Sequence, residues 1–101
     1  MRKEIITRSE DPCESIILTD VSDDGQTAVG FARQGRFERA LIWRQGKGVI
    51  TLVQYLRDRG VEVPFGWRMN VASLISADGK TIYGWGFNLN DQVEMFKAEL
   101  R

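Results

Sequence analysis

Four aspartates provide the residue types that acid–base or metal chemistry requires. Asp20, Asp23 and Asp24 lie close together in the sequence, and Asp78 follows Asp24 after 54 residues in a similar local context. If the two segments meet at one rim, their carboxylates could bind calcium or act as the acid and base of a glycosidase. However, Asp24 and Asp78 each precede a glycine, which is typical of hairpin turns. We therefore favour a turn-forming role and predict no catalytic residue and no metal ligand.

Other reactive groups are scarce. The chain contains no histidine, which excludes Ser-His-Asp and Cys-His nucleophiles and the usual zinc sites. The single cysteine, Cys13, excludes an internal disulfide, and we expect it to be an incidental residue of a polar segment. The segment Gly46-Lys47-Gly48 lacks the glycine spacing and the following Ser or Thr of a phosphate-binding loop. The sequence therefore indicates a protein that is not an enzyme and uses no cofactor.

A basic stretch with interleaved aromatic residues is the first candidate binding surface. Its members are Arg33, Arg36, Phe37, Arg39, Trp43, Arg44 and Lys47. Arg39 and Trp43 are four residues apart, an even spacing that places both on one face of a strand. Such strips are typical of nucleic-acid-binding proteins. Because Glu38 interrupts the strip and acidic turns belong to the same unit, we favour a solvated strand edge and keep nucleic-acid binding as an alternative.

Aromatic residues gathered in the second half form another candidate surface. They are Phe65, Trp67, Tyr83, Trp85 and Phe87. The last three alternate along one strand and share a face, which usually belongs to a core. Trp85 lies between two glycines, so its ring would pack on an adjacent sheet or be exposed at an interface. We predict an interaction surface that consists of Phe65, Trp67, Trp85, Phe87, Arg36, Arg39 and Trp43.

A segment that occurs twice must position these candidates. Residues 22–31, SDDGQTAVGF, return as residues 76–85, SADGKTIYGW, at an offset of 54. A Ser-x-Asp-Gly cluster between apolar runs predicts a hairpin, because Asp can bond the backbone ahead and Gly can adopt a positive φ. The hairpin strands are predicted at 15–21 and 27–32, and at 70–75 and 81–87. Third strands are predicted at 38–44 and 92–98, with a fourth in the first copy at 48–51.

Two further patterns complete the predicted repeat. Gly30, Gly84 and Gly86 fall on the face opposite the large side chains, where a neighbouring sheet or backbone can approach closely. Between the copies, apolar residues at helical spacing predict one short helix over 52–59. Thr51 and Gln54 have the spacing of a capping box, and Gly60 would end the helix.

These motifs resemble those of a known family. The order SDDG, VG, RALIW, GVITL, GW, SADGKTI and GWG, over residues of about 16–100, is similar to the HAF-type extracellular repeat of bacterial proteins. It is most similar to the two C-terminal repeats of such proteins. The resemblance implies β-propeller-like blades, often in exported proteins of unknown role, and no catalytic residues. The present chain departs from the family in starting without a signal peptide and in holding two repeats.

We therefore predict a mainly β protein with two antiparallel, propeller-blade-like repeats of three to four strands joined by one short helix. Residues 1–101 would form a single domain, with repeat one at about 15–52, the helix at 52–59 and repeat two at about 67–100. Repeat units bury their apolar faces against neighbouring units, so two blades alone leave open ends. The segment at residues 4–7 would close them, or the chain would associate with itself. Alternatively, the chain is a piece of a longer secreted propeller with a carboxylate-based hydrolase or calcium site.

Composition limits the class of partner. The chain has 14 basic and 14 acidic side chains and a formal net charge of zero, so nothing global favours nucleic acid or an anionic membrane. We expect a binding or protein-interaction module, such as a small inhibitor or adaptor, with a protein partner or a second copy. The start of the chain predicts a cytoplasmic location, or an extracellular one if the chain is a piece of a longer protein.

Overall fold

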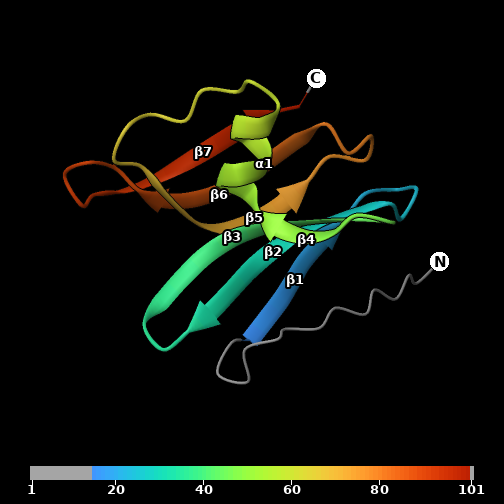
Figure 1. Cartoon of the computed structure of the whole chain (residues 1–101), viewed down its shortest axis with the longest axis horizontal. Helices are drawn as coiled ribbons and strands as arrows, with labels where there is room; N and C mark the ends of the chain where they lie inside the picture. Colours follow the sequence, from blue (N-terminus) through green and yellow to red (C-terminus); the bar gives the residue numbers. More distant parts are fainter. Residues whose placement is uncertain (1–14, 101) are drawn as a thin grey trace.

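The structure is a computed structural model that describes residues 15–100, and it consists of two antiparallel sheets and one short helix (Figure 1). Sheet A has the strand order β1-β2-β3-β4, and sheet B has the order β5-β6-β7. The elements are β1 Ser15–Val21, β2 Thr27–Gln34, β3 Phe37–Arg44, β4 Gly48–Thr51, α1 Leu52–Asp58, β5 Arg68–Ile75, β6 Thr81–Phe87 and β7 Val93–Glu99. The predicted mainly β fold is confirmed, although the sheets do not close into a barrel or propeller.

The first repeated turn is held by its own side chains. Ser22 Oγ donates a hydrogen bond to Asp24 Oδ1 at 2.7 Å, and the backbone N–H of Gln26 donates to the same oxygen at 2.9 Å. The N–H of Thr27 donates to Ser22 Oγ at 3.2 Å. Gly25 has a φ of 73°, a conformation that glycine adopts without a Cβ clash. The turn-forming role predicted for Asp24 is therefore confirmed.

The second turn reproduces this pattern atom for atom. Ser76 Oγ donates to Asp78 Oδ1 at 2.6 Å, and the N–H groups of Lys80 and Thr81 donate to Asp78 Oδ1 and Ser76 Oγ, each at 3.0 Å. Gly79 has a φ of 77°. The internal repeat is therefore a structural repeat as well as a sequence repeat.

The repeat extends into the strands, where each hairpin contains a bulge. The β1–β2 register shifts between Leu18 and Asp20, and the β5–β6 register shifts between Ala72 and Leu74. A second shift between Met69 and Val71 accompanies the start of β5 at Arg68, two residues before the predicted strand. Each of the two equivalent bulges lies next to a glycine of the partner strand, since Leu18 pairs with Gly30 and Ala72 with Gly84.

Gly30 and Gly84 lie where no side chain fits. A Cβ added to Gly30 would lie 2.0 Å from the Ile17 carbonyl oxygen, and one added to Gly84 would lie 2.1 Å from the Val71 carbonyl oxygen. The predicted close approach of backbone is therefore confirmed, and the approaching backbone belongs to the neighbouring strand of the same sheet. Gly86 meets the Arg68 carbonyl oxygen in the same way, at 1.8 Å.

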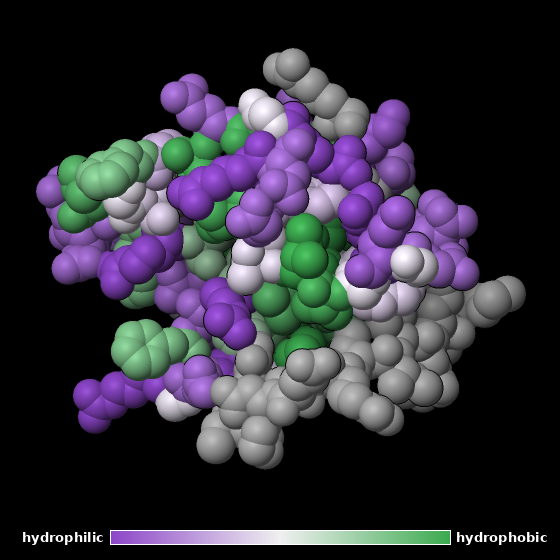
Figure 2. All heavy atoms as spheres, in the orientation of Figure 1, coloured by the Kyte–Doolittle hydropathy of each residue, from purple (hydrophilic) through white to green (hydrophobic). Residues whose placement is uncertain are grey.

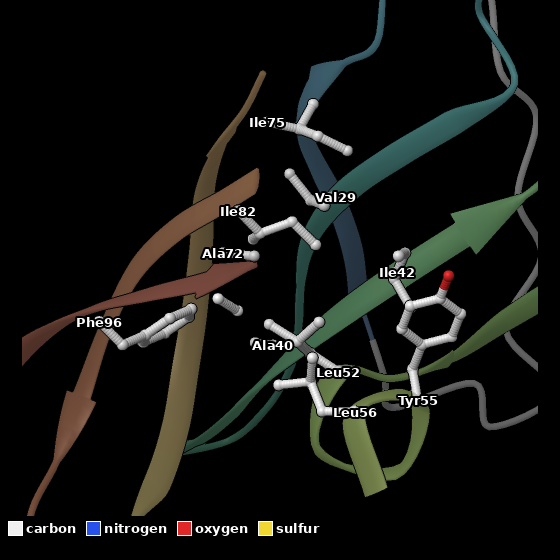
Figure 3. Close-up of a cluster of buried hydrophobic side chains, with 11 residues drawn as sticks. Val29, Ala40, Ile42, Leu52, Tyr55, Leu56, Ala72, Ile75, Ile82 and Phe96 are labelled. Carbon is white, nitrogen blue, oxygen red and sulfur yellow. The ribbon is translucent and has the colours of Figure 1, made fainter. Parts of the chain in front are cut away.

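The core lies between the sheets and beside the helix. Strand β5 contacts β1, β2 and β3, and α1 contacts β3, β4 and β5. Figure 3 shows side chains of both sheets pointing toward one another, with those of the helix next to them. They include Val29, Ala40 and Ile42 of sheet A, Ala72, Ile75, Ile82 and Phe96 of sheet B, and Leu52, Tyr55 and Leu56 of α1. Burial of each large aliphatic side chain contributes about 1.5–3 kcal/mol.

The helix begins as predicted but with only half of the capping box. Thr51 Oγ1 accepts a hydrogen bond from the N–H of Gln54 at 3.3 Å. The Gln54 side chain does not return to the cap, because its Nε2 donates to Asp58 Oδ1 at 2.7 Å. Gly60, with a φ of 74°, follows the last turn as predicted. Within residues 15–100, no helix has the length and apolar character needed to cross a membrane.

The sheets meet at an angle and give the molecule the form of a wedge. The two repeated turns lie near each other at the right of Figure 1, and the N–H of Asp23 donates to the Ala77 carbonyl at 3.0 Å. The free ends of the β2–β3 and β6–β7 hairpins diverge at the left of the same view. The predicted closing strand at residues 4–7 and the predicted position of Cys13 lie outside the described residues.

Candidate binding groove

A groove of about 530 Å³ opens at the wide end of the wedge. It is bounded by the β2–β3 turn, by α1, by the start of β5 and by the end of β6. In the view of Figure 2, hydrophobic and hydrophilic side chains are intermingled on this left-hand side of the molecule. We call it the arginine groove, after the four cations in its wall: Arg36, Arg39, Arg57 and Arg68.

Each arginine that lines the groove belongs to a different element. Arg36 lies in the β2–β3 turn after Gly35, whose φ is 60°, and Arg39 lies near the start of β3. Arg57 is in the last turn of α1, where a cation is favoured by the partial negative charge of the helix end. Arg68 begins β5. Because one acidic residue, Glu38, lines the groove with them, the wall has an excess of positive charge in a chain whose net charge is zero.

Only some of the charged side chains that line the groove form ion pairs. Glu38 Oε2 accepts a hydrogen bond from Arg33 Nη2 at 3.0 Å, so its charge is already engaged by a residue outside the groove lining. Arg68 pairs with Asp91 and stacks its guanidinium 5.1 Å from the Phe87 ring centroid. Within the described residues, neither Arg36 nor Arg57 belongs to an ion pair. These two guanidinium groups are the ones available to an incoming anion.

Aromatic and polar groups complete the wall. Phe37 is 82% exposed at the rim, while Trp67 and Phe87 are half-buried. Asn70 belongs to the β5 bulge, and its Oδ1 atom is buried without a hydrogen-bond partner. Buried polar atoms are normally paired, so an unsatisfied one next to a groove is consistent with a site that a ligand completes.

The structure places the seven residues of the predicted interaction surface at four locations, with Trp85 apart from the other six. Arg36, Arg39, Trp67 and Phe87 come together in the arginine groove. Phe65 is 90% exposed in the loop before β5. Trp43 shares its face of β3 with Arg39, as the even spacing predicted.

Trp85 lies on the face of sheet B that points away from sheet A. Its ring contacts that of Phe87 in a T-shaped arrangement with centroids 6.0 Å apart. Tyr83 is on the same face and is 40% exposed. The expectation that the alternating aromatics form core is therefore wrong, because sheet B contributes its other face, with Ile82, to the core.

Two groove arginines were not among the predicted site residues. Arg57 lies in the predicted helix and Arg68 follows Trp67, and neither belongs to a basic run. The signal that could have drawn attention to Arg57 is its place in the last turn of a helix directly before a glycine stop. Nothing local indicates that Arg68 joins Arg36, because their proximity depends on how the two sheets pack.

The basic stretch does not form a continuous strip. Arg33 pairs with Glu38, and its guanidinium lies 5.5 Å from the Phe31 ring centroid. Arg44 packs on the ring of Tyr55 at 4.7 Å, on the face opposite Arg39. Lys47 is exposed at the β3–β4 turn, at the other end of β3 from Arg36.

The two repeated turns lie at one rim, the condition under which their carboxylates could have formed a site, but Asp20, Asp24 and Asp78 have structural roles. Asp20 accepts hydrogen bonds from the backbone, and Asp24 and Asp78 hold their turns. The hydrogen bond from Ser76, followed by that from the Lys80 N–H, lowers the pKa of Asp78 below its ordinary value. No group of three His, Cys, Asp or Glu residues within 15–100 is placed to hold a metal ion.

Comparison of the chain with family models, with curated proteins and with solved structures finds no match. The similarity to HAF-type repeats therefore stays an expectation from sequence motifs.

Proposed function

We propose that this protein is a non-enzymatic binding module that captures an acidic segment of a partner protein in the arginine groove. The observation that carries the proposal is that four arginines line one groove of about 530 Å³ in a chain of zero net charge. Two of them, Arg36 and Arg57, belong to no ion pair within the described residues. A cationic concave surface concentrates anions and steers their approach. A small adaptor or inhibitor would act in this way.

The chemistry of the groove matches carboxylates attached to apolar residues. A guanidinium presents a planar fork of donors that can bind a carboxylate bidentately. Phe37 and Trp67 supply aromatic surface of the kind that anchors interfaces, and Val53 and Met69 add apolar wall beside them. A peptide with alternating acidic and large apolar side chains would engage both features.

The distribution of charge favours protein over nucleic acid. A nucleic-acid backbone carries a long row of phosphates and is normally bound by an extended cationic track. Here the basic side chains form no continuous track, because Arg33 is paired with Glu38 and Lys47 lies at the other end of β3. The rim at that end of the wedge also holds Asp23, Asp24 and Asp78. Nucleic-acid binding is therefore the alternative that a comparison of peptide and oligonucleotide probes must distinguish.

Fluorescence anisotropy with three labelled probes tests the proposal. The probes are a peptide of alternating Glu and Phe, the same peptide with Lys in place of Glu, and a single-stranded thymidine oligonucleotide of equal length. We expect the acidic peptide to bind most tightly and its affinity to fall as NaCl is raised from about 50 to about 500 mM, because salt screens exposed charge. Tighter binding of the oligonucleotide would replace the proposal with the nucleic-acid alternative.

Paired variants locate the binding site. Arg36→Ala with Arg57→Ala should raise the Kd for the acidic peptide about tenfold or more, since each lost charge-assisted contact contributes about 1 kcal/mol or more. Lys47→Ala with Lys80→Ala removes the same charge from exposed positions outside the groove and should change the Kd little. Equal losses in the two double variants would show only a general charge effect and would contradict a site in the groove. Far-ultraviolet circular dichroism of each variant checks the fold.

A further inference from the structure

Sheet B carries a second apolar surface on the side away from the core, which shares Phe87 with the lining of the arginine groove. We call it the outer face of sheet B and define it by Leu74, Tyr83, Trp85, Phe87, Val93 and Met95. These residues form three rows across the strands, because Leu74 pairs with Tyr83, Trp85 with Met95, and Phe87 with Val93. Met95 is 73% exposed, Val93 63% and Leu74 57%. Contiguous apolar side chains of this kind usually mark an interaction surface.

The internal repeat relates the outer face of sheet B to the core-facing side of sheet A. Tyr83 follows Val29 by 54 residues, and Met95 pairs with Trp85 as Ala40 pairs with Phe31. In sheet A these positions are covered by sheet B, so Val29 is 0% and Ala40 2% exposed. The outer face of sheet B is therefore the equivalent of a face that another sheet covers within this chain. Tyr83, Trp85 and Met95 keep apolar character at its centre, whereas Lys97 stands at the position of Ile42 and Leu74 at that of Asp20.

We infer that a second copy of this chain covers the outer face of sheet B, through a twofold-symmetric contact of that face with itself. A twofold contact uses the same patch on both copies and closes the assembly at a dimer. Head-to-tail stacking of blades would need a free opposite face on sheet A. That face is already buried, with Ala28 at 0%, Ala32 at 2% and Leu41 at 4% exposure. Within the described residues, the outer face of sheet B is the sheet face that is left open.

The charges around this face permit it to meet itself. Arg68 pairs with Asp91 at one end of the face. At the other end Lys97, which pairs with Tyr83 in the row of Leu74, has its Nζ 3.1 Å from Glu99 Oε1. Each end is therefore neutral, so two copies can approach without repulsion between like charges. The arginine groove differs in this respect, because its excess positive charge would repel a second groove. Self-association is thus assigned to the outer face and not to the groove.

Multi-angle light scattering after gel filtration of the full chain tests this inference. The monomer has a mass of 11.5 kDa, and we expect a species of about twice that mass that dissociates on dilution. Leu74→Glu with Met95→Glu should return the protein to the monomer mass, because four charges would be buried in the contact. The matched control, Phe65→Glu with Leu89→Glu, changes exposed loop residues that are 90% and 65% accessible and should stay dimeric.

A measurement on the unaltered protein covers the case in which the variant fails to fold. In a mixture of chains with labelled methionine methyl groups and unlabelled chains, isotope-filtered nuclear Overhauser spectra should show contacts from the Met95 methyl group to aromatic protons of the other copy. A chain that remains at 11.5 kDa up to about 1 mM would overturn the inference and leave the face to another partner. A dimer that persists in the Leu74→Glu, Met95→Glu variant, or one without intermolecular contacts at Met95, would overturn it as well.

Discussion

The backbone N–H of Ile75 donates a hydrogen bond of 2.8 Å to Asp20 Oδ2, across 55 residues of sequence. The other oxygen of the same carboxylate accepts the N–H of Val21 at 2.9 Å. Next to it, Thr19 Oγ1 donates to the Ala72 carbonyl at 2.6 Å. The end of β1 is thus joined to β5 by side chains that satisfy backbone groups of the other sheet, in addition to the apolar contacts of the core.

Replacement of Asp20 should show how much its hydrogen bond to the Ile75 N–H contributes to the free energy of unfolding. We expect Asp20→Ala to lower the free energy of unfolding by about 1–3 kcal/mol, because the partly buried N–H of Ile75 loses its acceptor. Asp20→Asn keeps an acceptor oxygen and should cost less. Chemical denaturation with urea measures both, with Glu62→Ala, an exposed substitution, as the control. Equal stability of Asp20→Ala and the unaltered protein would contradict the role of this carboxylate.

Alanine in place of Gly30 or Gly84 should strongly destabilise the protein. A Cβ at position 30 or 84 would overlap the carbonyl oxygen of Ile17 or Val71, so a strand must move, and we expect Gly30→Ala and Gly84→Ala each to cost about 2 kcal/mol or more. Gly46→Ala is the matched control, since nothing lies within 4 Å of its Cβ and only its φ of 77° opposes the substitution. Its cost should be about 1–2 kcal/mol. Thermal unfolding ranks the three, and a larger loss at Gly46 would refute the steric argument.

The turn that contains Asp78 should weaken in acid. The pKa of Asp78 is lowered in the folded state, chiefly by the hydrogen bond from Ser76 and next by that from the Lys80 N–H. A lowered folded-state pKa means that the ionised carboxylate stabilises the fold above the unfolded pKa of about 3.9, and that this stabilisation disappears as pH falls through the lower folded value. Ser76→Ala removes the largest cause and should move the pKa of Asp78 upward.

Carbon-13 nuclear magnetic resonance of the Asp78 carboxyl during an acid titration measures this shift directly. Thr51→Ala, which alters a helix cap in another part of the molecule, is the control and should leave the titration of Asp78 unchanged. An Asp78 titration that is the same in Ser76→Ala as in the unaltered protein would show that the Ser76 hydroxyl does not stabilise the carboxylate.

Truncation of a buried side chain of α1 should show how much the packing of the helix on the sheets contributes to the free energy of unfolding. Leu56 is 0% exposed between the sheets, and we expect Leu56→Ala to cost about 2–5 kcal/mol from lost burial and the cavity that remains. Leu89, which is 65% exposed in a loop, offers the same substitution outside the core, and its effect should be below about 1 kcal/mol. Urea denaturation compares them. Similar losses at both positions would contradict the packing of α1 on the two sheets.

The sequence alone determined the local structure of this protein. Ser-x-Asp-Gly specifies its turn through side chains two to five residues away from their backbone partners, so both hairpins follow from local chemistry. Local patterns likewise predict strand β3, which follows turn-prone residues, and the helix ends, which are set by the Thr51 cap and by Gly60. Boundaries differ from the predicted ones by one or two residues, as at the end of β2, the start of β3 and the start of β5.

Only the tertiary structure decided which face of each strand is covered. A period of two residues shows that Tyr83, Trp85 and Phe87 share a face, but either face of sheet B could have joined the core. The packing of β5 on sheet A directs Ile82 inward and leaves the aromatics outside. The same packing brings Arg57 and Arg68 to Arg36, from three segments that local sequence does not connect. Both surfaces therefore depend on contacts between residues distant in the chain, whose energies no local pattern contains.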